Sequence, residues 1–168
     1  MIELYEIQGL FPNILQEGFS AYKASLTTSS DIMITNWNVA SPFFSSGSFI
    51  AATGIYTVPV TGVYAMQATI SYATSSVITT QLGTSINPTF SIGRLSPTTA
   101  TLIRGQIPVF YTNVLVLSLR TILASSTITL SDVIRLTEGD TLGLLYNADG
   151  MTLSLDLKDI QWTIYRLQ

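Results

Sequence analysis

With 168 residues, the chain is long enough for one domain with its own hydrophobic core, and hydrophobic residues make up 47% of it. Charged residues make up only 10%, the formal net charge is -3 and the seven basic residues are scattered singly, so the chain lacks the basic patch that nucleic-acid binding requires. A chain this apolar and this weakly charged is expected to bury part of its surface in an oligomer.

Residues 1–17 are interpreted as an extension ahead of the domain. They begin with acidic residues and lack the basic n-region and the apolar h-region of a secretory signal. Within them, Asn13–Gln16 is the one segment where a helical turn is expected. The longest apolar stretch of the chain, Val114–Leu119 and its neighbours, is too short to cross a bilayer. The sequence therefore predicts neither a classical signal peptide nor a membrane span.

β-Branched and aromatic residues dominate the rest of the chain, and turn residues recur at short intervals, which predicts strands rather than helices. Asn113–Ala124 begins apolar on both faces, which predicts a strand buried on both sides. Alternation is clearest along Gly62–Tyr72, where one face is predicted to carry Tyr64, Met66, Ala68, Ile70 and Tyr72. The other expected strands are Phe19–Ser25, Asp31–Trp37, Ser126–Leu136, Asp140–Tyr146, Met151–Leu157 and Ile160–Gln168.

The polar stretch Leu82–Thr101 is interpreted as long loops around a short strand, and its loops are where partner binding is expected. Asp149-Gly150 predicts a hairpin turn. The whole pattern gives about 8–10 short strands, roughly one every 10–15 residues, without crossover helices. This spacing predicts an all-β fold, namely an antiparallel jelly-roll sandwich.

The segment Gly54–Tyr64 carries one Gly-x-Tyr unit at each end, around a Val-Pro-Val-Thr link, and holds no charged residue. Such a segment could be a ligand-binding loop. The alternative is a strand, a turn set by Pro59 and the next strand, in which the glycines permit a positive φ or a close backbone approach. Because proline suits the links between strands, we favour the structural interpretation.

The same segment resembles the core of the globular heads of the C1q-type family, which belongs with the tumour necrosis factor-like jelly rolls. Those heads carry Gly-x-aromatic-Thr, a short link with proline and then Gly-x-Tyr-x-aromatic. Here Gly54-x-Tyr56-Thr57 and Gly62-x-Tyr64 match this line without a gap. Met66 stands where the family usually has Phe, which is a tolerable exchange in a core.

Three further segments follow the family's order. Gly18–Ser25, which includes Phe19, looks like the first strand of such heads. Leu136–Leu144, which includes Gly139-Asp140, looks like the Leu-x-x-Gly-Asp turn near the family's end. The last segment, Trp162–Gln168, is similar to the terminal strands of bacterial members, such as the collagen-like glycoproteins of the exosporium of spore-forming bacilli.

The resemblance covers Phe19–Leu167 and departs from the family after Asn36, where the chain before Gly54 is longer. It implies a head domain over residues 18–168 that forms a homotrimer, with apolar and aromatic strand faces at the axis and outer loops on a partner. The implied function is non-enzymatic recognition and assembly at a bacterial cell or spore surface, with a protein or a glycan as ligand. Candidates for the core or the trimer axis are Tyr64, Tyr72, Leu115 and Leu117.

The remaining motifs favour neither a reaction nor a cofactor. The chain has no histidine and no cysteine, which excludes a Ser-His-Asp triad, a His₃ zinc site and thiol chemistry. Ser20–Lys23 has Ser-x-x-Lys spacing, but residues i and i+3 of the expected strand point to opposite faces. Glu138 and Asp140 are interpreted as turn acids rather than as a catalytic pair. Calcium occurs on loop carboxylates in C1q-type heads, so the resemblance leaves Asp140 and Asp149 as candidate ligands.

Two other classes of protein remain open. One is a viral or phage fibre head or capsid jelly roll, which a fibre stalk in the parent gene would mark. The other is a carbohydrate-active jelly-roll enzyme, which would need two carboxylates about 5–10 Å apart in a groove.

Overall fold

The computed structural model describes residues 17–74, 81–114 and 117–168, so the helical turn expected at Asn13–Gln16 lies outside the described residues. These ranges contain thirteen strands and no helix, and thus no helix long enough to span a membrane. The strands are β1 (Gly18–Thr28), β2 (Ile32–Met33), β3 (Phe44–Ser45), β4 (Phe49–Ile50), β5 (Ile55–Thr57), β6 (Gly62–Thr74), β7 (Thr89–Ser96), β8 (Ala100–Gln106), β9 (Val109–Val114), β10 (Leu117–Ile122), β11 (Ser125–Leu136), β12 (Thr141–Asn147) and β13 (Leu155–Arg166).

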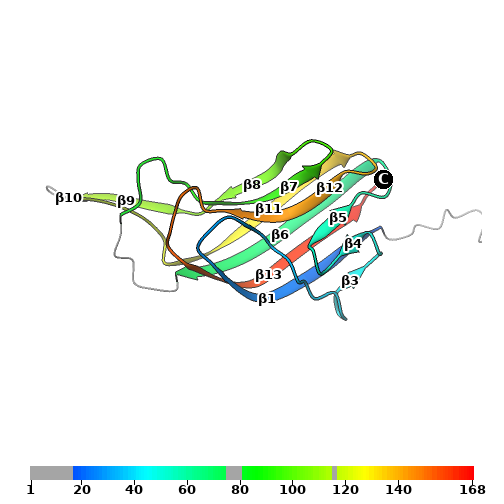
Figure 1. The fold of residues 1–168 in the computed structure, drawn as a ribbon, viewed down its shortest axis with the longest axis horizontal. Helices are drawn as coiled ribbons and strands as arrows, with labels where there is room; N and C mark the ends of the chain where they lie inside the picture. The colour runs from blue at the N-terminus through cyan, green and yellow to red at the C-terminus, as the bar shows by residue number, and fades with distance from the viewer. Residues whose placement is uncertain (1–16, 75–80, 115–116) are drawn as a thin grey trace, which may run out of the picture.

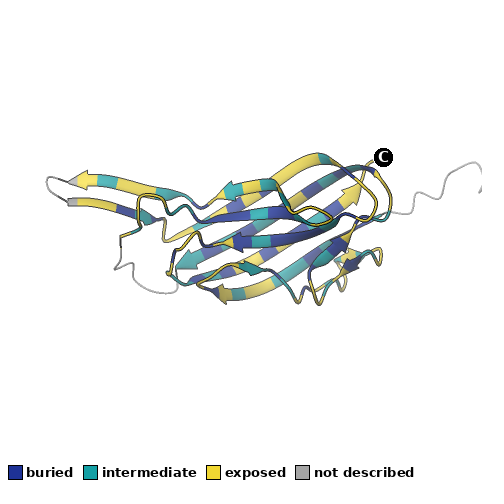
Figure 2. Ribbon diagram, turned by 45° about the horizontal axis from the view of Figure 1, so that its top comes forward, coloured by how far each residue is buried: buried dark blue, intermediate teal, exposed yellow. Residues whose placement is uncertain are grey.

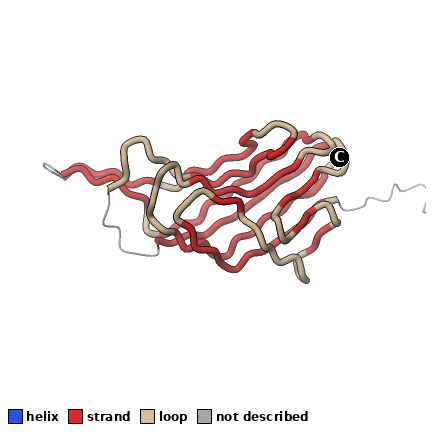
Figure 3. Tube along the Cα trace, in the orientation of Figure 1, coloured by secondary structure: helices blue, strands red, loops and turns tan. Residues whose placement is uncertain are grey.

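Most of these strands form two antiparallel sheets that pack on each other (Figure 1). The first, called the β6 sheet, has the order β11-β6-β13-β1-β3; the second, called the β12 sheet, has the order β4-β5-β12-β7-β8, with β2 also paired to β12. β9 and β10 pair with each other in a ribbon that extends beyond one end of the sandwich (Figure 3). The predicted all-β antiparallel sandwich is therefore confirmed. Its strands outnumber the expected ones because β2 to β5 have only two or three residues each.

The alternation predicted for β6 places this strand in the middle of the core. Its inward residues are all 3% exposed or less: Tyr64, Met66, Ala68, Ile70 and Tyr72. The residues between them are half-buried or exposed, as the alternating colours of the strands in Figure 2 show. Because successive side chains of a strand point to opposite faces, this period decides which face of the β6 sheet packs on the β12 sheet.

Aromatic rings join the two sheets. Phe19 of β1 stacks on Phe49 of β4 with ring centroids 3.8 Å apart, and it meets Trp162 of β13 at 4.9 Å with the ring planes nearly perpendicular. Trp37, which lies between β2 and β3, packs on Phe49 at 6.4 Å and on Trp162 at 5.7 Å. Each such pair contributes about 0.5–1.5 kcal/mol beyond the area it buries. The cluster therefore links four segments that are distant in the sequence.

The Gly54–Tyr64 segment passes from one sheet to the other. β5 belongs to the β12 sheet and β6 to the β6 sheet, so the segment is a strand, a link and a strand, as the structural interpretation expected. Tyr56 and Tyr64 are fully buried, and their ring centroids lie 6.4 Å apart across the sandwich. Gly54 has a φ of 72°, and a Cβ at this position would lie 2.2 Å from the carbonyl oxygen of Ile34.

The prediction of one strand over Asn113–Ala124, buried on both sides, is wrong. β9 ends at Val114, and β10 begins at Leu117 and runs antiparallel to it. The ribbon is largely in solvent, with Tyr111 57% and Leu119 39% exposed. An apolar run on both faces fits a buried strand and an outlying ribbon equally well, so the period alone did not separate them.

Two further expectations differ from the structure. Leu82–Thr101, expected as loops around a short strand, contains all eight residues of β7 and the start of β8, because serine and threonine suit the outward face of a strand. Met151–Leu157 and Ile160–Gln168, expected as two strands, are joined in β13. This strand begins only at Leu155, and its register shifts near Asp159, which has a φ of 49°.

The expected strand Asp31–Trp37 is a strand only over β2. The amide of Ile34 still donates to the carbonyl oxygen of Leu144 at 2.9 Å. Asn36, however, has a φ of 57°, and a left-handed residue interrupts extended backbone. This interruption sends the indole of Trp37 into the aromatic cluster, where it is 7% exposed.

We predict that Gly54→Ala lowers the free energy of unfolding by about 2–4 kcal/mol, because the methyl group adds a backbone clash to the strain of a positive φ. Gly47→Ala is the matched control: its φ is 96°, but nothing lies within 4 Å of the added Cβ. This control should lose only about 1–2 kcal/mol from backbone strain. Urea denaturation of the three proteins measures both losses, and equal losses would contradict the clash.

Candidate functional site

The Gly139-Asp140 turn is bonded to the link that follows β5. The amide of Gly139 donates to the carbonyl oxygen of Val58 at 2.9 Å, and the amide of Val58 donates to the carbonyl oxygen of Asp140 at 2.8 Å. The Asp140 carboxylate is 3% exposed, accepts the amide of Thr137 at 3.0 Å and lies 3.7 Å from the Arg94 guanidinium. Asp140 therefore holds the turn together and is not placed to pair with Glu138 over a substrate.

Most of the residues singled out from the resemblance lie inside the sandwich. Phe19, Tyr56, Tyr64 and Tyr72 are 3% exposed or less, and Gly54 and Gly62 stand at the start of the two segments that carry the buried tyrosines. Tyr64 and Tyr72 thus belong to the core and cannot meet a second copy at an axis. Leu115 lies outside the described residues, and the side chain of Leu117 is not described.

The two calcium candidates lie at opposite ends of β12, since Asp140 precedes the strand and Asp149 follows it. One ion could not contact both, because a strand of this length separates them by about 20 Å or more. Within residues 17–74, 81–114 and 117–168, no group of three or more His, Cys, Asp or Glu side chains is placed to hold a metal ion. Calcium binding at either aspartate stays a prediction of the resemblance.

The outward face of the β6 sheet carries three neighbouring rows of uncharged side chains. Gln67 of β6 lies at their centre, opposite Ser131 of β11 and Thr163 of β13. We call this surface the uncharged face. Its residues are Val133, Ala65 and Tyr165 in the first row, Ser131, Gln67, Thr163, Ser20 and Phe44 in the second, and Thr129, Thr69, Gln161 and Tyr22 in the third.

Large apolar groups of the uncharged face are open to solvent. Val133 is 56% exposed, Tyr165 is 44% exposed and Phe44 is 40% exposed. The nearest charged residues are Arg135, opposite Val63 beyond the first row, Lys158, opposite Ser71 beyond the third, and Asp159 of β13, whose carboxylate accepts the Tyr22 hydroxyl at 3.0 Å. The surface therefore combines exposed apolar groups with hydroxyl and amide groups and holds no charged side chain of its own.

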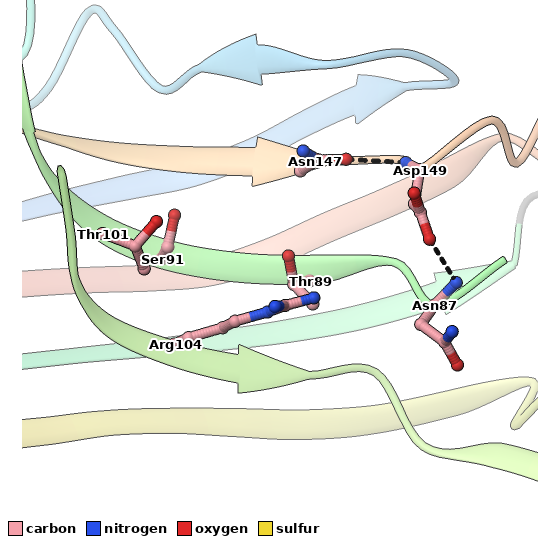
Figure 4. Close-up of a pocket in the computed structure, with 7 residues that line it drawn as sticks. All are labelled: Asn87, Thr89, Ser91, Thr101, Arg104, Asn147 and Asp149. Atoms are coloured by element: carbon pink, nitrogen blue, oxygen red, sulfur yellow. Dashed lines mark hydrogen bonds between the residues drawn. The ribbon is translucent and has the colours of Figure 1, made fainter. Parts of the chain in front are cut away.

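The outward face of the β12 sheet carries a pocket of opposite character. This outer pocket has a volume of about 160 Å³ and is lined by Asn87, Thr89, Ser91, Thr101, Arg104, Asn147 and Asp149 (Figure 4). The register places Ser91 of β7 opposite Arg104 of β8, and Thr89 of β7 opposite Asn147 of β12. Every lining side chain is polar, so the pocket suits a hydrophilic ligand.

Hydrogen bonds fix one end of the outer pocket. The Asp149 carboxylate accepts the amide of Asn87 at 2.7 Å, and the side-chain oxygen of Asn147 accepts the amide of Asp149 at 2.7 Å (Figure 4). The side-chain oxygen of Asn87 in turn accepts Arg120 Nη2 at 2.8 Å and Gln106 Nε2 at 3.1 Å. The positions of Asn87 and Asp149 are therefore set before any ligand arrives.

Sequence reasoning found part of this pocket for a different reason. Leu82–Thr101, where binding loops were expected, supplies four of the lining residues, but three of them, Thr89, Ser91 and Thr101, come from β7 and β8. Arg104 and Asn147 were missed. The signal that could have found the pocket is the alternation of Thr89 and Ser91 with the buried Phe90 and Ile92, which marks a strand with a polar outward face.

The two sheets, their strand order and the Gly-x-Tyr crossing define a jelly roll of the C1q and tumour necrosis factor type. Among solved structures, the globular domain of zebrafish complement 1qA matches 91% of this chain and 98% of its own at 14% identity and a TM-score of 0.56. Eiger TNF from S. frugiperda matches 91% of this chain and 94% of its own at 16% identity and a TM-score of 0.57. Murine APRIL matches 90% of this chain and all of its own at 13% identity and a TM-score of 0.56.

These similarities establish the fold alone, because the sequences share so few residues. No family model matches the chain, and no curated protein matches it in sequence. The C1q/TNF-like jelly roll inferred from short motifs is thus confirmed by structure.

We predict that removing the Tyr64 and Tyr72 hydroxyls has different effects. Tyr64 donates to the carbonyl oxygen of Val60 at 2.6 Å, whereas the buried Tyr72 hydroxyl has no partner among the described residues. Tyr64→Phe should therefore lower the free energy of unfolding by about 1 kcal/mol, and Tyr72→Phe should leave it unchanged or raise it. Thermal denaturation compares the stabilities of the two variants. A larger loss of stability in Tyr72→Phe than in Tyr64→Phe would overturn the assignment of the hydrogen bond to Tyr64.

We also predict that stability falls as the pH rises above about 10. Burial raises the pKa of the Tyr72 and Tyr146 phenols to about 12 from the ordinary 10, with the Asp31 charge adding to the effect at Tyr146. Below pH 10 both states keep these protons; between about pH 10 and 12 only the folded state does, so unfolding is favoured by releasing them. Urea denaturation at pH values from about 9 to about 12 measures the decline in the free energy of unfolding. A Tyr72→Phe, Tyr146→Phe double variant should decline less steeply, and an unchanged slope would contradict the cause.

Proposed function

We propose that the protein is a non-enzymatic head that assembles as a homotrimer through the uncharged face and recognises a partner with the surfaces left outside. The observation that carries this proposal is the uncharged face itself. Val133, Tyr165 and Phe44 expose apolar area there, and the hydroxyl and amide groups around Gln67 can pair with their counterparts on another copy. Because the face holds no charged side chain, its first two rows can be buried at little cost, with the Asp159 carboxylate left in solvent beside the third.

The fold and the resemblance support the same assignment. The C1q/TNF-like jelly roll is the fold for which the resemblance implies threefold packing. All thirteen strands of the described residues lie within residues 18–168, the range proposed for the head. The similarity of Trp162–Gln168 to the terminal strands of exosporium glycoproteins supports a place at a bacterial cell or spore surface, in an extracellular assembly. The partner would be a protein or a glycan.

A mass measurement tests the trimer directly. Light scattering at micromolar concentration should return three times the 18.2 kDa mass of the single chain. A mass of 18.2 kDa would overturn the proposal.

Gln67→Glu should shift the wild-type assembly toward single chains. Gln67 is exposed in the single chain, so a nearly isosteric carboxylate is tolerated there, but a trimer would bury its charge at a cost of several kcal/mol. The matched control is Gln81→Glu, at an exposed residue outside the β6 sheet. Light scattering over a dilution series should show a weaker assembly for Gln67→Glu and an unchanged one for Gln81→Glu. Equal behaviour of the two variants would mean that another surface joins the copies.

A further inference from the structure

The outer pocket lies on the sheet that the proposed trimer leaves free. Thr89 and Ser91 lie on the outward face of the β12 sheet, since Phe90 and Ile92 between them are buried against the β6 sheet. The uncharged face is on the far side of the sandwich. A ligand in the pocket and a second copy on the uncharged face therefore do not compete for space.

Arg104 gives the pocket an available positive charge. Its side chain is exposed and lies beside Thr89 in Figure 4, and within the described residues its guanidinium has neither an ion pair nor a hydrogen bond. By comparison, Arg94 lies near Asp140, and Arg120 donates to Asn87 and Gly83. A planar guanidinium with free donors matches the two oxygens of a carboxylate, with which it forms a bidentate pair.

The groups around Arg104 suit the hydroxyls of a sugar. Ser91 and Thr101 place their hydroxyl groups next to each other, and Thr89 lies between them and the fixed end of the pocket (Figure 4). Asp149 uses one carboxylate oxygen to accept the amide of Asn87, and its other oxygen can accept a hydrogen bond from a ligand hydroxyl.

The charge balance narrows the ligand further. One guanidinium and one carboxylate share the pocket, so a doubly charged phosphate would be attracted by Arg104 and repelled by Asp149. A singly charged ligand with several hydroxyls satisfies both side chains. The uniformly polar lining disfavours an apolar ligand, because such a ligand would leave these groups without water or a partner.

We propose that the outer pocket binds a carboxylate-bearing sugar unit, such as a uronic or sialic acid residue of a glycan. The sugar carboxylate pairs with Arg104, and its hydroxyls bond to Ser91, Thr101 and Asp149. This inference deepens the proposed recognition function by naming its site and ligand class. In a trimer, three such pockets would act on one glycan surface and raise a weak affinity through multivalency.

Titration of the full chain with glucuronic acid, followed by the backbone amide resonances of Ser91 and Thr101, tests the pocket. Glucuronamide is the uncharged counterpart, acetate is the carboxylate without a sugar ring, and N-acetylneuraminic acid represents the sialic acids. Glucuronate or N-acetylneuraminate should shift both resonances to saturation. Glucuronamide should bind about tenfold to a hundredfold more weakly, because charge-assisted bonds are lost. No saturable shift with either acid would overturn the site.

Arg104→Gln should weaken glucuronate binding about tenfold to a hundredfold, since the guanidinium supplies the charged contact. Arg135→Gln, which removes an exposed arginine from the β6 sheet, is the matched control and should bind as the wild type does. Unchanged binding by Arg104→Gln would overturn the role of the guanidinium. Equal binding of glucuronate and glucuronamide would overturn the proposed role of the ligand's carboxylate. Equal binding of acetate and glucuronate would overturn the proposed role of its sugar ring.

The same samples separate this inference from the trimer. Light scattering gives the mass of each sample, and the Gln67→Glu variant allows the titration to be repeated on weakly associated chains. Binding by that variant supports the pocket whatever the mass of the wild type proves to be. If the wild type is a trimer that binds neither glucuronate nor N-acetylneuraminate, the proposed ligand site is overturned and the assembly proposal stands.

Discussion

Phe19 of β1 stacks on Phe49 of the opposite sheet and makes an edge-to-face contact with Trp162 of the neighbouring strand β13. The two sheets pack on each other around these rings. The rest of the sandwich depends on this packing, since the strands that carry the rings must keep their inward faces in register. In the described ranges, Arg94 and Asp140 form the one ion pair. Burial rather than charge pairing therefore stabilises the fold, which is consistent with a chain in which only 10% of residues are charged.

The Gly-x-Tyr segment is the second element of this packing. Its glycines and tyrosines suggested a ligand loop as readily as a scaffold, but Tyr56 and Tyr64 meet inside the sandwich. The link between them is bonded through Val58 to the Gly139-Asp140 turn. Two motifs that are far apart in the sequence therefore belong to one structural unit, and neither contributes a side chain to the outer pocket.

Sequence reasoning succeeded where one face of a strand is buried and failed where polarity or exposure was uniform. β6 was predicted with its inward face because Tyr64 to Tyr72 alternate with small or polar residues. The ribbon of β9 and β10 was mistaken for a buried strand, since nothing local distinguishes an apolar strand in a core from one in solvent. The pocket could not be assembled from sequence, because Asn87 and Asp149 are brought together only by pairing between β7 and β12.

The two outward faces would respond differently to burial. On the uncharged face, a second copy would displace water from apolar, hydroxyl and amide groups, which can pair across the interface. On the β12 sheet, burial would remove water from the Arg104 guanidinium, which pairs with no carboxylate within the described residues, at a cost of several kcal/mol. The distribution of charge therefore favours an assembly in which the β6 sheet turns inward. In the proposed assembly the outer pocket would stay in solvent, and the proposed ligand would replace the water around the Arg104 guanidinium.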